Sequence, residues 1–347
     1  MRILHVLASD RFSGAENVVC QIISLLKNDA NIEMAYTSTD GPIREALTER
    51  GINFLPMSKL CKNELARIIK EYSPEMIHAH DMRASYIASL VAKGIPIICH
   101  IHNNAFASRG LTVKSIAFIF AARKAKHIFW VSDSAYNGYF FKQFFKRKSS
   151  VLPNIIDIDA LYDKMQKDTK TYDYDVVYLG RLSYPKNPQR MISVLSKVLK
   201  EIPNARFAVV GSGELEEETK KAAVDCGVYH NIDFLGFMSN PLKIVHDSKV
   251  MIMTSRWEGT PMSALESMAL GTPIITTPTD GLINLIDNNV NGFASDDDDV
   301  LKDKIITLMN DIEKRMQFSE NAIRKARILN DKRSYLNCLL EQYKCRR

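Results

Sequence analysis

The 347-residue sequence lacks the features that mark membrane-spanning, secreted and disulfide-rich proteins. No stretch reaches the roughly 18 uncharged apolar residues that a membrane span requires. The apolar run at the N-terminus is too short for a signal peptide and predicts a first strand instead. The six cysteines are scattered without paired spacing, which argues against a disulfide framework and against a zinc site. We therefore expect a soluble or peripheral protein of the reducing cytoplasm.

Short internal repeats and low-complexity tracts are also missing, whereas the length suits two domains of roughly 150 to 180 residues. We predict a first domain over residues 1–157, a polar linker over 158–173 and a second domain over 174–330. Residues 331–347 are predicted to form a C-terminal helix that packs back on the first domain.

Apolar runs alternate with helical patterns in both halves, which is typical of parallel sheets covered on both faces. We therefore predict an α/β fold with two Rossmann-like domains that face each other across a cleft, followed by C-terminal helices. Predicted strands are Ile3–Ala8, Ile32–Thr37, Asn53–Pro56, Met76–His80, Ile97–His102, His127–Val131 and Val151–Pro153, then Val176–Leu179, Phe207–Val210, Ile232–Leu235, Val250–Thr254 and Ile274–Thr277.

The stretch from Val250 to Gly281 is the most informative part of the chain. It predicts a buried strand, a short loop, and a helix that starts near Pro261 and stops at Gly271. Thr260 is suited to cap that helix, and Pro261 to its first position. A helix N-terminus at the carboxyl end of a parallel strand is a ready site for a phosphate.

Two acids flank this helix start, Glu258 in the loop and Glu266 inside the helix. Both acids could face one crevice and accept hydrogen bonds from sugar hydroxyl groups. The alternative is that Glu258 is a solvated loop acid and Glu266 an exposed helix residue. A phosphate site beside two hydroxyl acceptors favours a nucleotide-sugar as ligand.

Two cations follow a predicted strand in Gly180-Arg-Leu-Ser-Tyr-Pro-Lys-Asn187. At the carboxyl end of that strand, Arg181 and Lys186 could hold a diphosphate, or they could be ordinary surface charges. The segment Gly211-Ser-Gly213 hints at a dinucleotide-binding turn, but Glu216 stands where a third glycine is required. We expect this turn to serve the passage from strand to helix.

The four histidines His78, His80, His100 and His102 cluster at the ends of two predicted strands. Alternation places each pair on one face of the sheet, as in a metal site. No ligand spacing is complete, so we predict hydrogen-bonded histidines and no metal.

Residues 109–150 carry nine basic residues and one acidic residue, together with many aromatic residues. Such helices either lie on an anionic bilayer or cover a sheet with their bases solvated. Nucleic acid is not expected, because no recognition motif accompanies the bases. The acidic run Asp296–Asp299 predicts the start of a helix.

The segments Glu258-Gly-Thr-Pro261, Leu265-Glu-Ser-Met-Ala-Leu-Gly-Thr-Pro273 and Gly180-Arg-Leu182 with Lys186-Asn187 resemble a known signature. It is the donor site of retaining GT-B glycosyltransferases of the large bacterial polysaccharide and lipid-linked-sugar family (family 4-like, group 1). Ser13-Gly14-Ala15-Glu16 is similar to the Gly-Gly-Ala-Glu of that family, although Ser13 replaces the first glycine. His102 follows Pro96 at the spacing of a family histidine near the sugar.

The resemblance implies roles for individual residues. The catalytic residues would be Arg181 and Lys186, which neutralise the leaving diphosphate, with Glu258 and His102 near the donor sugar. The donor would also be bound by Gly14, Gly259, Thr260, Pro261, Leu265 and Glu266, with Glu266 on the ribose hydroxyls. Glu16 and His80 are candidates for the acceptor side.

The function implied is transfer of a hexose or N-acetylhexosamine from a nucleoside diphosphate sugar, expected to be UDP-linked, with retention and without a metal cofactor. The acceptor would be a hydroxyl of a lipid-linked saccharide in bacterial surface polysaccharide synthesis, at the inner face of the cytoplasmic membrane. Two alternatives remain: a nucleotide-sugar epimerase of the same fold, and a non-catalytic nucleotide-sugar-binding module.

Overall fold

The computed structural model describes residues 1–102 and 108–344, so Asn103 and the last three residues of the predicted C-terminal helix lie outside the described part. The chain divides into two compact units. Unit 1 consists of residues 1–155 together with the C-terminal segment that starts at Lys332, and unit 2 consists of Ile156–Asp331. Within the described residues, no helix is both long and apolar enough to cross a membrane.

Unit 1 is built on one parallel sheet with the strand order β2-β1-β3-β4-β5-β6. Its strands are β1 (Arg2–Val6), β2 (Glu33–Thr37), β3 (Met76–His80), β4 (Ile97–Ile101), β5 (His127–Trp130) and β6 (Ser149–Val151). Its helices are α1 (Gly14–Leu26), α2 (Ile43–Glu49), α3 (Lys62–Tyr72), α4 (Asp81–Val91), α5 (Val113–Lys124), α6 (Asp133–Gly138), the 3-10 helix η2 (Lys142–Lys148) and α15 (Lys332–Lys344).

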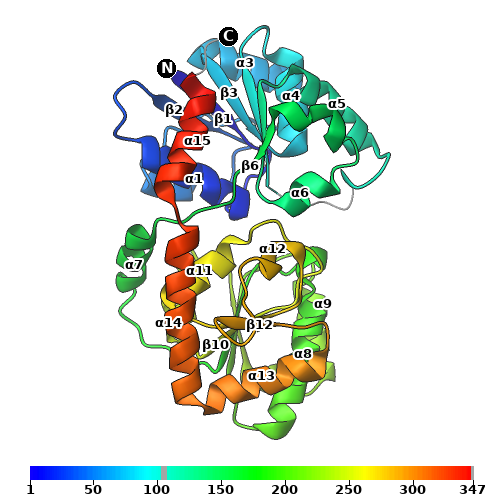
Figure 1. Cartoon of the computed structure of the whole chain (residues 1–347), viewed down its shortest axis with the longest axis vertical. Helices are drawn as coiled ribbons and strands as arrows, with labels where there is room; N and C mark the ends of the chain where they lie inside the picture. Colours follow the sequence, from blue (N-terminus) through cyan, green and yellow to red (C-terminus); the bar gives the residue numbers. More distant parts are fainter. Residues whose placement is uncertain (103–107, 345–347) are drawn as a thin grey trace. The chain divides into compact units, whose positions relative to one another are not determined.

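Alternating side chains divide the sheet of unit 1 into two buried faces, as its parallel strands require. Leu4, Ile77 and Ile128 belong to a core that includes residues of α3, α4 and α5. A smaller core joins Leu7 and Tyr36 to residues of α1 and α2. Helices therefore cover both faces of the sheet (Figure 1).

Helix α15 belongs to unit 1 although it lies at the end of the chain. Its residues Tyr335, Leu339 and Tyr343 recur every four positions, so they share one face, and all three are buried. The hydroxyl of Tyr343 lies 2.8 Å from Nδ1 of His78 in β3. Residues far apart in sequence thus complete the covering of the first sheet.

Unit 2 contains a second parallel sheet, with the strand order β12-β11-β10-β7-β8-β9. Its strands are β7 (Val176–Leu179), β8 (Phe207–Val210), β9 (Ile232–Gly236), β10 (Val250–Met253), β11 (Ile274–Thr276) and β12 (Gly292–Ala294). Its helices are α7 (Ile158–Gln166), η3 (Tyr184–Lys186), α8 (Pro188–Glu201), α9 (Glu216–Asp225), η4 (Tyr229–Asn231), α10 (Leu242–Asp247), α11 (Met262–Leu270), α12 (Asp280–Ile283), α13 (Asp298–Asn310) and α14 (Ile312–Leu329).

The two parallel sheets confirm the predicted α/β class, with some differences in the elements. The segment predicted as a strand at Asn53–Pro56 forms only an isolated bridge, between Phe54 and Tyr36. Strand β12 was not predicted. Residues 158–173, predicted as a linker, begin with α7 and belong to unit 2. The apolar residues Leu161 and Met165 are buried, which explains why this polar segment is helical.

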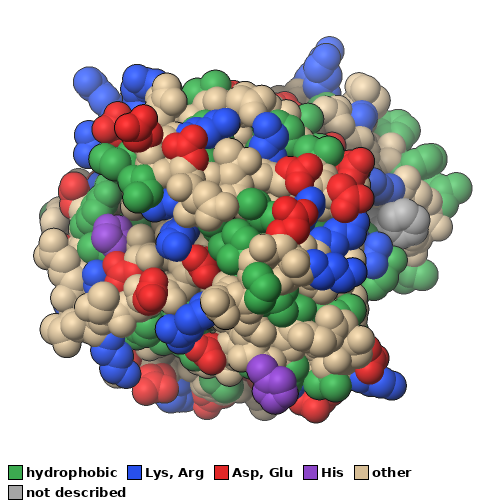
Figure 2. Space-filling model, turned by 90° about the horizontal axis from the view of Figure 1, so that it is seen from below, with side chains coloured by type: hydrophobic (Ala, Val, Ile, Leu, Met, Phe, Trp, Pro, Cys, Tyr) green, Lys and Arg blue, Asp and Glu red, His purple; other side chains and the backbone are tan. Residues whose placement is uncertain are grey.

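The acidic run at 296–299 begins a helix, as predicted. The side chain of Asp297 caps α13 by accepting from the backbone N–H groups of Asp299 and Val300. Asp298 and Asp299 form ion pairs with Arg190 and Lys197 of α8. Figure 2 shows acidic and basic side chains interspersed on one face of the molecule.

Candidate functional site

The strand order of unit 2 marks one position as a candidate ligand site. From β7 the sheet continues through β8 and β9 in one direction, and from β10 through β11 and β12 in the other. The order reverses between β7 and β10, which are direct neighbours. Open α/β sheets bind ligands outside the carboxyl ends of the strands at such a switch point. The two loops that leave these strands, 180–187 and 254–261, carry the motifs identified in the sequence.

Lys186 and Glu258 meet at this position. Nζ of Lys186 lies 2.6 Å from Oε1 of Glu258, and the Ser255 hydroxyl donates to the same oxygen over 2.6 Å. Only 8% of the Glu258 side chain is exposed, against 23% for Lys186. The sequence assigned these residues separately, to diphosphate and to sugar, whereas the structure pairs them. A buried carboxylate is thus neutralised by a cation that stays partly accessible.

Two further bonds hold the loops together at their bases. The Thr254 hydroxyl donates to the carbonyl of Asn187 over 3.0 Å. The Arg256 amide donates to the carbonyl of Pro185 over 2.8 Å. Asn187 has a left-handed backbone, with φ of 51°, which lets η3 turn directly into α8. The chain therefore fixes the Lys186 backbone against the loop that carries Glu258.

Glycines allow three backbone segments to pack closely around the site. A Cβ atom on Gly211 would lie 2.0 Å from the carbonyl oxygen of Gly180, and one on Gly213 would lie 2.2 Å from that of Leu182. The Gly-x-Gly turn after β8 thus packs on the loop after β7, which agrees with the packing role expected from sequence. A Cβ atom on Gly281 would lie 1.7 Å from the carbonyl oxygen of Gly259.

Helix α11 begins next to Pro261, where the sequence predicted its start. Met262 is its first residue, and Pro261 occupies the N-cap position without a cap hydrogen bond from its own side chain. The predicted place of Pro261 as first helical residue is therefore wrong by one position. The N–H groups in the first turn of a helix have no partner within the helix and can bind an anion. The predicted stop is confirmed, since Gly271 ends the helix with φ of 79°.

The other predicted donor residues of unit 2 differ in burial. Leu265 is 4% exposed and packs in the core, and Glu266, one residue on, is half-buried. Arg181 is exposed, and among the described residues its guanidinium has no ion pair or hydrogen bond. Arg181 thus remains available to an added anion.

Sequence reasoning missed Arg256. Its guanidinium donates to Oδ1 of Asn187 over 2.9 Å and lies over the Tyr184 ring, 4.5 Å from the centroid. It stands inside the Ser255–Thr260 loop, so its position in that loop could have signalled a role. The cation–π contact and the hydrogen bond fix both loops on their exposed side.

In unit 1 the strand order reverses between β1 and β3, and candidate residues gather there too. Gly14 is the first residue of α1, where an added Cβ would meet no heavy atom within 4 Å. Glu16 is buried and accepts a hydrogen bond from the Ser13 hydroxyl. Ser13, which replaces the first glycine of the family pattern, therefore orients the Glu16 carboxylate.

His80 and His102 lie side by side at the carboxyl ends of β3 and β4. Nδ1 of His80 is 2.8 Å from Nε2 of His102, and the backbone N–H of His102 donates to Oδ1 of Asp81 over 3.0 Å. Burial lowers the pKa of His102 to about 3 and raises the pKa of the Asp81 carboxyl to about 6. His102 is thus a neutral imidazole at pH 7. Its Nε2 contacts His80, a contact that the sequence did not reveal.

Comparison with known proteins gives two family matches that together span most of the chain. The model described as glycosyl transferases group 1 matches residues 162–325, and the model described as glycosyltransferase family 4 matches residues 12–160. The first match contains both loops of the switch point in unit 2. The second contains Gly14, Glu16 and the four predicted histidines.

Individual relatives agree with these matches. The chain is 24% identical to the UDP-Gal:alpha-D-GlcNAc-diphosphoundecaprenol alpha-1,3-galactosyltransferase of Escherichia coli, over 89% of this chain and 90% of that protein. It is 27% identical to the O-antigen biosynthesis glycosyltransferase WbnH of Escherichia coli, over 92% of each. Among solved structures, Anabaena Alr3699/HepE in complex with UDP-glucose has a TM-score of 0.84 at 20% identity, over 99% of each chain.

The fold class and the family predicted from sequence are therefore both confirmed. The chain is a glycosyltransferase that belongs to the group 1, family 4-like glycosyltransferases with the GT-B fold.

Proposed function

We propose that the protein moves a hexose or N-acetylhexosamine from a UDP-sugar to a hydroxyl of a lipid-linked saccharide in bacterial surface polysaccharide synthesis. The observation that carries the proposal is the contact between Lys186 and Glu258 at the switch point of unit 2. A cation held by a carboxylate beside a helix start suits a substrate with a diphosphate on one side and hydroxyl groups on the other.

The reacting bond joins the anomeric carbon of the sugar to the diphosphate. As it breaks, negative charge grows on the leaving oxygen, and groups aimed at that oxygen lower the barrier. Arg181, Lys186 and the first N–H groups of α11 are the groups proposed for this task. The departing phosphate takes the proton of the acceptor hydroxyl on the same face of the sugar. That step gives retention and needs neither a separate base nor a metal.

Glu258 and Glu266 are proposed to bind the two sugars of the donor. With one oxygen occupied by Lys186 and Ser255, Glu258 keeps its other oxygen as an acceptor for a hydroxyl of the transferred sugar. The half-buried Glu266 is proposed to accept from the ribose hydroxyls. The backbone of Gly259 and the side chain of Leu265 complete the donor site. Gly14 and His102 are proposed for the donor, and Glu16 and His80 for the acceptor side, of unit 1.

The lipid-linked acceptor is supported by the name of the galactosyltransferase relative, whose acceptor is a diphosphoundecaprenol-linked sugar. The UDP donor is supported by the same name and by the solved complex with UDP-glucose.

The experiment is to incubate the purified protein with UDP-, GDP- and ADP-sugars, with and without bacterial membrane lipid extract, and to measure nucleoside diphosphate release. We expect release with UDP-sugars that depends on the extract and falls at least tenfold in Arg181→Ala and Lys186→Ala. Lys200→Ala, an exposed lysine of α8, is the matched control and should act like wild type. Acceptor-independent sugar isomerisation would favour an epimerase, and donor binding without turnover would favour a binding module.

We further propose a peripheral contact between unit 1 and the anionic inner face of the cytoplasmic membrane. The segment 109–150 combines both arrangements considered from sequence. Phe118 and Phe145 pack into the core, whereas Phe120, Phe140 and Phe144 are exposed, Phe144 by 80%. Exposed aromatic residues beside bases suit the interface of an anionic bilayer.

The bases of this segment are not equivalent. Lys148 donates to the carbonyls of Arg123 and Ala125, whereas Lys146 and Arg147 are exposed. We expect vesicles with anionic lipid to co-sediment the protein. Lys146→Gln with Arg147→Gln should weaken this by up to about 30-fold at low salt, because each base in full contact with the surface contributes about 1 kcal/mol. Co-sedimentation unaffected by these changes and by Phe144→Ser would exclude the patch.

A further inference from the structure

Five imidazoles lie together at the carboxyl ends of β1, β3 and β4 in unit 1. In the register of the sheet His5 is beside His78, and His80 is beside His100. His102 follows β4 on the same face, and its ring stacks on that of His100 with centroids 4.2 Å apart. The sequence indicated four of these histidines and missed His5, which stands alone in an apolar strand.

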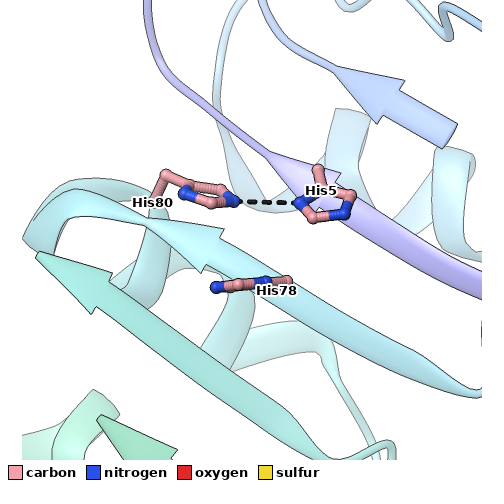
Figure 3. Close-up of side chains that lie close together, drawn as sticks. All are labelled: His5, His78 and His80. Carbon is pink, nitrogen blue, oxygen red and sulfur yellow. Dashed lines mark hydrogen bonds between the residues drawn. The ribbon is translucent and has the colours of Figure 1, made fainter. Parts of the chain in front are cut away.

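The hydrogen bonds within this histidine cluster leave several buried nitrogens without a partner. His80 uses both ring nitrogens, since Nε2 is 3.0 Å from Nδ1 of His5 and Nδ1 is 2.8 Å from Nε2 of His102. Figure 3 shows the first of these contacts, with His78 close to both rings. His100 is fully buried, yet neither of its nitrogens has a partner among the described residues. An unpartnered buried polar group of this kind costs about 1–3 kcal/mol and requires an explanation.

A metal ion explains the unpartnered nitrogens better than a second network of hydrogen bonds. A neutral imidazole offers one lone pair, and burial keeps these rings neutral because it lowers the pKa of His80 and His100 well below 6.5. Imidazole nitrogen is a preferred ligand of Zn²⁺, Cu²⁺ and Ni²⁺. Two groups of three histidines have ligand atoms within 4.8 Å of one another, and both groups include His80.

The group formed by His80, His100 and His102 is the better of the two. It contains His100, whose nitrogens are both uncommitted, and His102, whose Nδ1 is buried without a partner among the described residues. The remaining nitrogen of His80 contacts His5, an outer partner of the kind that orients ligand histidines. Tetrahedral Zn–N bonds of about 2.0–2.1 Å separate two ligand nitrogens by about 3.3 Å. The 2.8 Å contact between His80 and His102 therefore has to open by only about half an ångström.

Against the expectation from sequence, we propose that His80, His100 and His102 form a binding site for one divalent transition-metal ion of the zinc class. While the ion is bound, His80 and His102 are not available for the substrate contacts proposed above. Asp81 strengthens the site. Its partly buried carboxylate accepts a hydrogen bond from the backbone N–H of His102 and places a negative charge next to an otherwise neutral ligand set.

The test is titration of the EDTA-treated full chain with Co²⁺, followed by its visible absorption, and with Zn²⁺ by calorimetry. The Cys226→Ser background removes an exposed thiol that could bind the same ions. We expect one Co²⁺ per chain with the strong visible bands of a tetrahedral ion. Zn²⁺ should displace the Co²⁺ and raise the melting temperature of unit 1.

Substitutions distinguish the two histidine groups. His100→Phe should abolish binding, and His100→Gln provides the same test if the phenylalanine variant does not fold. His5→Gln should weaken binding by about 10- to 100-fold, as loss of an outer partner does. His246→Gln, in unit 2, is the control that should leave binding unchanged. Retention of the site in a folded His100 variant, or stoichiometric binding that needs His5 and His78 instead, would overturn the proposal.

Discussion

Replacing Lys186 by methionine tests whether the Lys186–Glu258 pair serves stability alone or also the donor. At 2.6 Å the gross attraction is about 6 kcal/mol for an effective dielectric constant of 20, most of it offset by desolvation. Removing one partner of a buried pair costs about 3–5 kcal/mol, and the 23% exposure of Lys186 admits water and lowers that figure. We expect the free energy of unfolding of unit 2 to fall by about 2–3 kcal/mol.

The chain contains a closely matched control. Lys243 pairs with Asp247 at 2.8 Å in α10, with side chains 23% and 10% exposed, against 23% and 8% for the site pair. Lys243→Met should therefore destabilise unit 2 to a similar degree. Only Lys186→Met should also weaken UDP binding, by about 10- to 100-fold, because it removes a charge-assisted bond of about 1.5–3 kcal/mol.

Two assays measure these effects. Trp130 lies in unit 1 and Trp257 in unit 2, so a Trp130→Phe background makes Trp257 fluorescence report on unit 2 alone. Unfolding should shift down by about 5–10 °C in both lysine variants, at about 2–4 °C per kcal/mol. Calorimetry then gives the UDP affinity. Equal UDP affinities in the two variants would refute a donor role for Lys186.

Three other predictions follow from single features. Gly281→Ala should displace the Gly259 backbone, because the new Cβ would lie 1.7 Å from its carbonyl oxygen, and should lower turnover at least tenfold. Gly110→Ala is the control and should be neutral, because nothing lies within 4 Å of its Cβ. Equal turnover in the two variants would disprove the clash. Tyr343→Phe should lower the free energy of unfolding of unit 1 by about 1–3 kcal/mol in denaturant titration, since it leaves a nitrogen of His78 unpaired. Unit 1 should lose stability below about pH 6.5, because His5 and His102 take up protons in the unfolded chain but not in the folded one, where burial lowers their pKa to about 3. Each histidine contributes about 1.4 kcal/mol per pH unit, and the raised pKa of Asp81 acts in the opposite direction. An unfolding midpoint, followed by Trp130 fluorescence, that stays constant between pH 7.5 and 5.5 would contradict this prediction.

Local patterns in the sequence predicted the sheets well. Buried parallel strands are continuous apolar runs, so β7, β8 and β3 were located to the residue. Strand β12 was missed because its three residues, Gly292–Ala294, carry too little pattern. Helix α7 was missed because its few apolar residues stand among lysines and aspartates.

The sequence named candidate site residues without their contacts. The motifs singled out Lys186 and Glu258, but their pairing across 72 positions depends on β7 and β10 being neighbours. The pairing of Gly281 with Gly259 likewise depends on the path of the chain after β11. His5 gave no signal by itself, because its meaning comes from the strands placed beside it.

The central claim is that the loops after β7 and β10 hold the nucleoside diphosphate, and hydrogen exchange with mass spectrometry tests it most directly. With saturating UDP, we predict slower amide exchange in residues 180–187 and 255–266 and unchanged exchange in α13. Unchanged exchange in both loops, in a sample whose UDP binding is demonstrated by calorimetry, would contradict the claim.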